Sequence, residues 1–295
     1  MFDRIMGRYL AEKGKITEDQ LAGVYQTQDS KRAKLGVIAV AEKLMTVAQA
    51  EEINALQATM DKRFGDLATE RGYLNNIQVG RLLSLQGDEF LVFTSAIVDR
   101  GIMTLQEVDD EIKNYQRENN LTDDELTALT HGDLDAVAAI YLDTKDPECI
   151  SLFSYGIKNL YRLVDSHMSI GEAYTATDIG DDCVSYQSFS GDINATVAII
   201  GKDKDLQRMA KSYTKEEFIE TGEDALDAMC ELINCINGLY ATEKSRQGKR
   251  IELEPPVFHT KYSHISGEEI HVIPVYSCGG KVSLVVSVNH EVTVK

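Results

Sequence analysis

Apolar and polar positions repeat with a period of 29 residues through the first third of the chain. One series consists of Gly7, Gly36 and Gly65, with Thr94 in the fourth place. A second series marks four helix starts, each a capping residue followed three positions later by Gln or Glu: Thr17 and Gln20, Thr46 and Gln49, Asn75 and Gln78, Thr104 and Glu107. Such a capping box satisfies free backbone amides at the start of a helix. The pattern predicts four all-α helical-hairpin repeats over residues 1–120, which must stack to bury their apolar faces.

The helical pattern continues in the next thirty residues. Thr122 and Glu125 form a further capping box, and DLDAVAAIYL is an apolar helical segment. The polar cluster TKDPEC, which contains Pro147, has the composition of a domain boundary. We therefore expect a helical connector over residues 121–149 and a second domain over residues 150–295.

From residue 150 onward, helical segments alternate with strand-like ones. SLFSYGIKNLYRLVDSHM, KDLQRMAKSY and EDALDAMCELINCINGLYATEK have helical spacing, whereas CVSYQSF, NATVAIIG, KRIELEPP, EEIHVIPVYS and KVSLVVSVN have strand character. Short turns join most of these strands, so we expect an α+β fold with helices packed on a mainly antiparallel sheet. KVSLVVSVN is apolar enough that, as an edge strand, it would need covering.

The long helix predicted from residue 224 carries a narrow polar stripe. At roughly 100° per residue, Asp227, Glu231, Asn234 and Gly238 fall within about 60° of one another. Apolar residues occupy the opposite side: Ala225, Met229, Leu232, Ile233, Ile236 and Tyr240. Amphipathicity alone predicts a solvated face here as readily as a functional one.

Composition and charge narrow the possible functions. The 295 residues include 30 basic and 48 acidic ones, a net charge of −18, which disfavours nucleic-acid binding. No apolar run is long enough for membrane insertion, and the N-terminus lacks the features of an export signal, so we expect a cytoplasmic protein. The five cysteines form no C-x-x-C, and the spacing of Asp178, Asp181 and Asp182 does not fit a calcium loop. We expect no metal ligands, and a solvated turn at these aspartates.

The segment DAMCELINCINGLY resembles the signature helix of the CheC/CheX/FliY family of chemotaxis phosphatases. An acidic residue, Asp227, precedes Glu231 by four positions, and Asn234 follows Glu231 by three. Gly238 comes four residues later, and Pro256 follows Asn234 after 21 intervening residues. The leading helix has no second E-x-x-N, so the resemblance is to the CheX type, with one site per chain.

This resemblance implies a function and a set of partners. A CheX-type domain removes phosphate from the aspartate of a phosphorylated CheY-like receiver. Asn234 would orient the attacking water and Glu231 would pair with the receiver's lysine, with Asp227, Gly238 and Pro256 in supporting roles. The receiver would supply Mg²⁺, and the domain would need no cofactor of its own. The resemblance also implies a homodimer formed by sheet extension. The alternative is a non-catalytic adaptor, related to flagellar switch proteins, that only binds partners.

The N-terminal repeats weakly resemble another group, the helical N-terminal modules of secretion and pilus ATPases. The matching segments are GRYLAEKGKITEDQ and LGVIAVAEKLMTVAQ. This favours docking of a further protein by residues 1–120, while a structural or dimerising role stays open.

Overall fold

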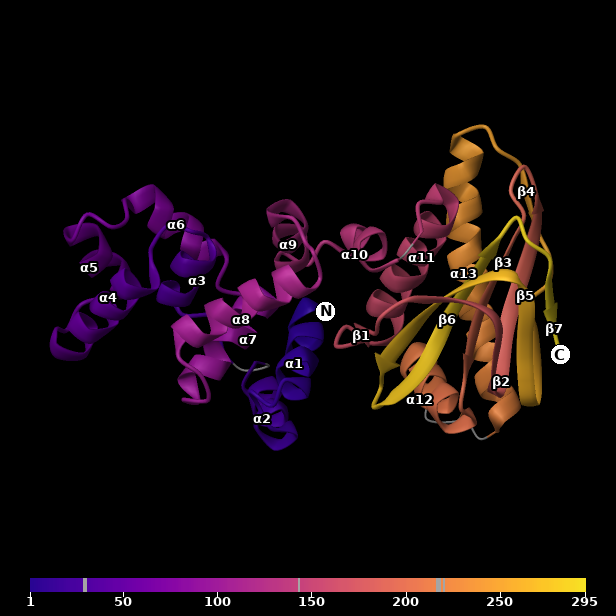
Figure 1. Cartoon of the computed structure of the whole chain (residues 1–295), viewed down its shortest axis with the longest axis horizontal. Coiled ribbons are helices and arrows are strands. Elements are labelled where there is room, and N and C mark those ends of the chain that lie inside the picture. Colours follow the sequence, from indigo (N-terminus) through magenta and orange to yellow (C-terminus); the bar gives the residue numbers. More distant parts are fainter. Residues whose placement is uncertain (29–30, 143, 216–218, 220) are drawn as a thin grey trace. The chain divides into compact units, whose positions relative to one another are not determined.

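The computed structural model describes residues 1–28, 31–142, 144–215, 219 and 221–295. These residues divide into two compact units, residues 1–132 and residues 133–295 (Figure 1). The segment expected as a connector is shared between the units, since its first helix falls in the first unit and its second helix in the second. Among the described residues, no helix is long and apolar enough to cross a membrane.

The described part of the first unit is all-α. Its helices are α1 (Phe2–Glu12), α2 (Glu18–Gln28), α3 (Leu35–Ala41), α4 (Val47–Thr59), α5 (Phe64–Glu70), α6 (Asn76–Ser84), α7 (Glu89–Asp99), α8 (Leu105–Glu118) and α9 (Asp123–Thr130). The predicted capping boxes form. At α4, for example, the Gln49 amide donates to Thr46 Oγ1 at 3.2 Å, and the Thr46 amide donates to Gln49 Oε1 at 2.8 Å.

The regularly spaced glycines of this unit lie where helices pack closely. A Cβ on Gly7 of α1 would meet Tyr25 Oη of α2 at 2.2 Å. A Cβ on Gly65 of α5 would meet Val79 Cγ1 of α6 at 2.8 Å. Both distances are shorter than real Cβ contacts, so a side chain at either position would force Tyr25 or Val79 to move.

The second unit combines helices with an antiparallel sheet, as the sequence predicts. Its elements are α10 (Leu134–Tyr141), α11 (Pro147–Asn159), the π-helix η1 (Leu160–Val164), β1 (Ser169–Ile170), β2 (Tyr174–Gly191), β3 (Ala195–Gly201), α12 (Asp203–Thr214), α13 (Gly222–Arg246), β4 (Ile251–Leu253), β5 (Val257–Ser277), β6 (Gly280–Val288) and β7 (Val292–Val294). Figure 1 shows α11, α12 and α13 beside the sheet.

Two expectations about the strands are wrong. The strands run in the order β1-β5-β6-β3-β2-β4, with β7 on β5 and a further pairing between β5 and β2. KVSLVVSVN forms β6, which pairs with both β3 and β5 and so is not an edge strand. The expected homodimer therefore does not follow from an exposed β6.

The aspartates 178, 181 and 182 lie within β2, whose first half pairs with β5, and not in a turn.

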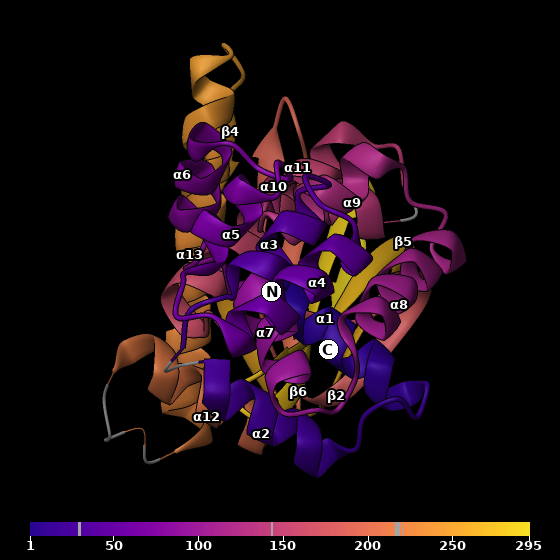
Figure 2. The ribbon, with the colours of Figure 1, turned by 90° about the vertical axis from the view of Figure 1, so that its left-hand side faces the viewer.

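Helix α13 is anchored by its apolar side. Six side chains on that side are 0% exposed: Ala225, Met229, Leu232, Ile233, Ile236 and Tyr240. They pack against strands β2, β3 and β5 and against helices α11 and α12. The helix is continuous over its 25 residues, and part of its orange ribbon is visible at the left of Figure 2.

A charged cluster fastens the second half of α13 to α11. The Glu148 carboxylate of α11 accepts a hydrogen bond from Tyr240 Oη at 2.7 Å and pairs with Lys249 Nζ at 2.7 Å. It also pairs with Lys244, which is only 8% exposed. Burial alone would raise the pKa of Glu148, but the hydrogen bonds from Lys244, Lys249 and Tyr240 outweigh it and lower that pKa from 4.5 to about 2.

We expect Glu148→Gln to lower the free energy of unfolding by about 3 kcal/mol at neutral pH, because Lys244 is then left buried without its counter-charge. The folded-state pKa of Glu148 is lowered, so its stabilisation is present above about pH 4.5 and is lost as the pH falls toward 2. Urea denaturation of both proteins between pH 7 and 2 measures this. The difference between them should shrink below about pH 4.5, and a difference that is independent of pH would contradict the assignment.

Candidate functional site

The polar stripe predicted on the long helix lies on the exposed face of α13. The side chains of Asp227, Glu231 and Asn234 are exposed, and Gly238 is partly buried. The sequence spacing therefore places all four residues on one helix face, opposite the anchored side. The three polar side chains are available to a macromolecular partner that docks along the helix.

The amide of Asn234 is held by a hydrogen-bond chain that reaches into the interior. Gln187 of β2, which is 1% exposed, donates from Nε2 to Asn234 Oδ1 at 2.9 Å and to the backbone carbonyl of Glu254 at 2.7 Å. Asn237 of α13, which is 0% exposed, donates from Nδ2 to Gln187 Oε1 at 2.9 Å. Among the described residues, Asn237 Oδ1 has no hydrogen-bond partner. The sequence interpretation did not include Gln187 or Asn237.

Glu231 lies one turn before Asn234 and is not tied down in the same way. Within the described part of the chain, its carboxylate forms no hydrogen bond or ion pair. Tyr213 of α12 lies nearby: burial is the main cause of its raised pKa, and the charge of Glu231 contributes. The carboxylate of Glu231 is therefore available for a cation on a partner.

Gly238 leaves the helix surface bare beside these side chains. A Cβ built on Gly238 meets no heavy atom of the described residues within 4 Å, so none of them requires glycine there. Pro256 is not on α13. Together with Pro255, it lies in the short link between β4 and β5, directly after Glu254, whose carbonyl accepts the hydrogen bond from Gln187. The structure thus connects the Pro256 segment to Asn234 through one intervening side chain.

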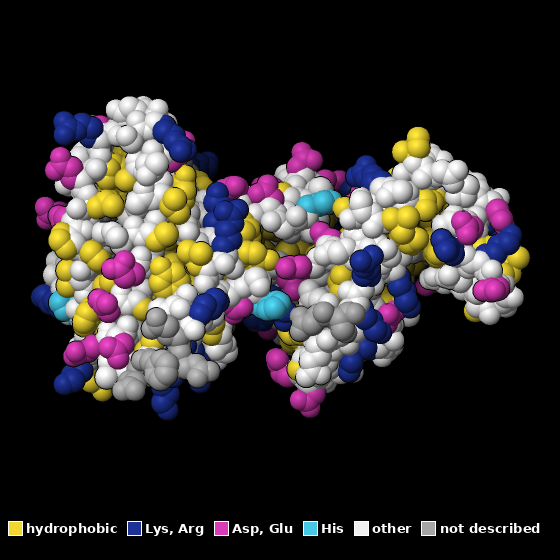
Figure 3. Space-filling model, turned by 180° about the vertical axis from the view of Figure 1, so that it is seen from behind, with side chains coloured by type: hydrophobic (Ala, Val, Ile, Leu, Met, Phe, Trp, Pro, Cys, Tyr) yellow, Lys and Arg dark blue, Asp and Glu magenta, His cyan; other side chains and the backbone are white. Residues whose placement is uncertain are grey.

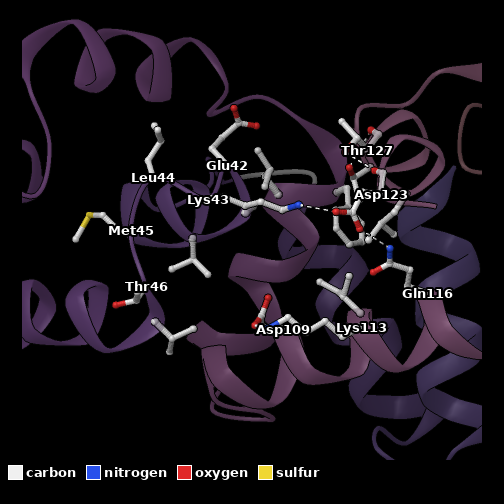
Figure 4. A pocket seen from close by; sticks show the side chains of 18 of the residues that line it. Glu42, Lys43, Leu44, Met45, Thr46, Asp109, Lys113, Gln116, Asp123 and Thr127 are labelled. Carbon is white, nitrogen blue, oxygen red and sulfur yellow. Dashed lines mark hydrogen bonds and ion pairs between the residues drawn. The ribbon is translucent and has the colours of Figure 1, made fainter. Parts of the chain in front are cut away.

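Outside the polar stripe, the described residues form no comparable candidate site. They contain no group of three or more His, Cys, Asp or Glu side chains suited to a metal ion. A cavity of about 750 Å³ lies in the first unit (Figure 4). Most of its charged side chains are paired, among them Lys43 with Asp123 at 3.6 Å and His131 with Glu42 at 3.2 Å. On the molecular face in Figure 3, basic and acidic side chains are interspersed and do not gather in one field.

Comparison with known proteins agrees with the sequence interpretation of the second unit. The family described as chemotaxis phosphatase CheX matches residues 184–275, a range that includes Gln187, Glu231, Asn234 and Pro256. The predicted resemblance of this region to the CheX type is therefore confirmed. No curated protein matches the chain.

Solved structures with similarity to the chain include two single proteins and one complex. CheX from Desulfovibrio desulfuricans is 15% identical, with 48% of this chain and 99% of that chain covered and a TM-score of 0.42. A CheC-like superfamily protein from Shewanella sp. PV-4 is 14% identical, with 50% and 99% covered and a TM-score of 0.43. A complex of CheX, CheY, BeF₃ and Mg²⁺ from Borrelia burgdorferi gives 14% identity, 49% and 96% coverage and a TM-score of 0.38.

We expect Gly238→Ala to raise the free energy of unfolding by about 1 kcal/mol, because alanine favours a helix over glycine and its methyl group meets open space here. Gly156→Ala in α11 is the matched control. Its Cβ would meet Leu284 Cδ2 at 2.6 Å, so this change should destabilise the fold. Chemical denaturation measures both. A Gly238→Ala variant less stable than the wild type would show that the chain itself needs this glycine.

Proposed function

We propose that the second unit hydrolyses the aspartyl phosphate of a phosphorylated CheY-like receiver. The observation that carries the proposal is the arrangement on α13: an exposed carboxylate and, one turn later, an exposed amide held by buried partners. The match of residues 184–275 to the chemotaxis phosphatase family supports it, because that range contains both residues.

The chemistry suits an amide. Water attacks phosphorus in line, the bond from phosphorus to the aspartate oxygen breaks, and inorganic phosphate and a free carboxylate are released. Acyl phosphates hydrolyse readily, so a catalyst mainly has to hold the water in position. Asn234 has donors and an acceptor but cannot act as a base, and it would orient the water as a glutamine does in GTP hydrolysis. By the family resemblance, Mg²⁺ would be held by the receiver.

Glu231 and Gly238 would set the docking. The unpaired carboxylate of Glu231 would pair with the receiver's lysine and fix the register of the complex, as charged pairs do at interfaces. Glycine at position 238 costs about 1 kcal/mol relative to alanine in a helix interior. Since no described atom of the chain lies within 4 Å of where its Cβ would be, we attribute the bare surface to close approach by a partner. Asp227 extends the same face by one turn.

Substitutions of Asn234 and Glu231 should distinguish the residue that positions water from the residue that docks the receiver. Asn234→Ala is expected to slow dephosphorylation by about 100-fold with little change in receiver binding, because it removes the group that orients water and leaves Glu231 in place. Glu231→Ala should weaken binding as well as rate, because it removes a charge that pairs across the interface. Receivers phosphorylated with acetyl phosphate, followed by phosphate release and by titration calorimetry, provide the two measurements.

Glu243→Ala is the control, since Glu243 lies on α13 outside the stripe and pairs with Arg246. It should leave both binding and rate unchanged. Full activity of Asn234→Ala, in a system where the wild type is active, would overturn the proposed mechanism. A wild-type protein that binds a receiver and does not accelerate its dephosphorylation would instead establish the non-catalytic adaptor.

A further inference from the structure

We propose that Gln187 is a positioning residue that fixes which end of the Asn234 amide faces the partner. The inference rests on the proposed function for its catalytic consequence, but its structural content does not. Gln187 belongs to β2 and not to the signature helix, and its buried side chain bridges the sheet, α13 and the Pro256 segment.

The orientation of Gln187 follows from one unambiguous partner. The backbone carbonyl of Glu254 can only accept, so the group 2.7 Å from it must be the Nε2 of Gln187. That nitrogen has two hydrogens, and the second points to Asn234 at 2.9 Å. The atom of Asn234 facing Gln187 must then be an acceptor, Oδ1. The network itself therefore assigns the direction of both amides.

This assignment determines what Asn234 presents outward. Its Oδ1 is held toward the protein, and its Nδ2, with two hydrogens, faces away toward a docked partner. Donation by Gln187 to Oδ1 also polarises the amide and strengthens Nδ2 as a donor. Within the described residues, no group takes up the Nδ2 hydrogens or the second lone pair of Oδ1, so these stay available for the water and the phosphoryl oxygens. A preset amide need not be ordered when the receiver docks.

Two features hold Gln187 itself in place. Asn237, fully buried on α13, donates to Gln187 Oε1 at 2.9 Å and so fixes the other end of its amide. Glu254 precedes Pro255, which favours an extended backbone at Glu254, and the Glu254 amide donates to the Ser188 carbonyl of β2 at 3.0 Å. The proline segment thereby keeps the Glu254 carbonyl opposite Gln187.

The structural part is tested on the free full-length protein by NMR. We expect the side-chain amide of Asn234 to be ordered, with a ¹⁵N heteronuclear NOE close to that of the buried Gln187 amide. Asn76, whose exposed side chain forms no hydrogen bond within the described part of the chain, serves as the mobile reference. An Asn234 amide as mobile as that of Asn76 would overturn the inference whether or not the protein is a phosphatase.

The catalytic part is tested with Gln187→Met, which keeps the size of the side chain and removes its donors. We expect about a tenfold lower kcat for receiver dephosphorylation at unchanged KM, because the water-orienting group is less well held. Ser185→Ala is the matched control. Ser185 is also buried on β2 and donates to α13, to the Leu226 carbonyl at 2.9 Å, but it does not contact Asn234.

The outcomes separate the explanations. A lower kcat in Gln187→Met with Ser185→Ala unchanged supports the positioning role. An unchanged kcat in folded Gln187→Met, or an equal fall in both variants, overturns it. If Gln187→Met does not fold, Asn237→Ser, which removes only the anchor of Gln187, replaces it with the same expected direction. A wild-type protein without activity refutes the proposed function, and the NMR result then stands as the test of the orientation.

Discussion

Burial of one face of α13 is the constraint on which the candidate site depends. The apolar side chains of that face are fully buried, and each contributes about 1.5–3 kcal/mol when removed from water, apart from the smaller Ala225. Rotating the helix by even one residue would expose part of this set, whereas the polar stripe gains little from any particular position. The core therefore decides which way Glu231 and Asn234 point. The core thus sets the direction of the helix face, and the hydrogen bond from Gln187 sets the orientation of the Asn234 amide on it.

Apolar packing is not directional, so two polar networks are needed to fix the exact position of α13. Glu148 holds the second half of α13 through Tyr240 and Lys244, which fixes the helix along its own axis. Gln187 holds the middle of the helix through Asn237 and Asn234. Buried polar groups are costly unless hydrogen-bonded, so a shift of the helix would break bonds that water cannot replace. Each hydrogen-bond network thus fixes the position of α13, which apolar packing alone would allow to slide.

Local signals in the sequence predicted local structure well. The capping boxes and the exposed stripe depend on residues within a few positions of one another, and they form as expected. Lys43 shows the limit of such signals: its φ of 56° is the left-handed conformation that glycine adopts at Gly14, Gly72 and Gly101, the equivalent places in the 29-residue pattern. The pairing of β2 with β5 and of β6 with β3 was missed, because those partners are distant in the sequence.

Gln187 was missed for a related reason, although the sequence contained a weak signal. Within CVSYQSF, alternation places Ser185, Gln187 and Phe189 on one face of the strand, and all three are buried. A glutamine at an inward position must find hydrogen-bond partners, so its presence predicts a polar contact inside the domain. The partners are not predictable locally: Asn234 lies 47 residues away and Glu254 lies 67 away. Only the folded arrangement of the sheet and α13 shows that the buried amide of Gln187 hydrogen-bonds to the exposed amide of Asn234.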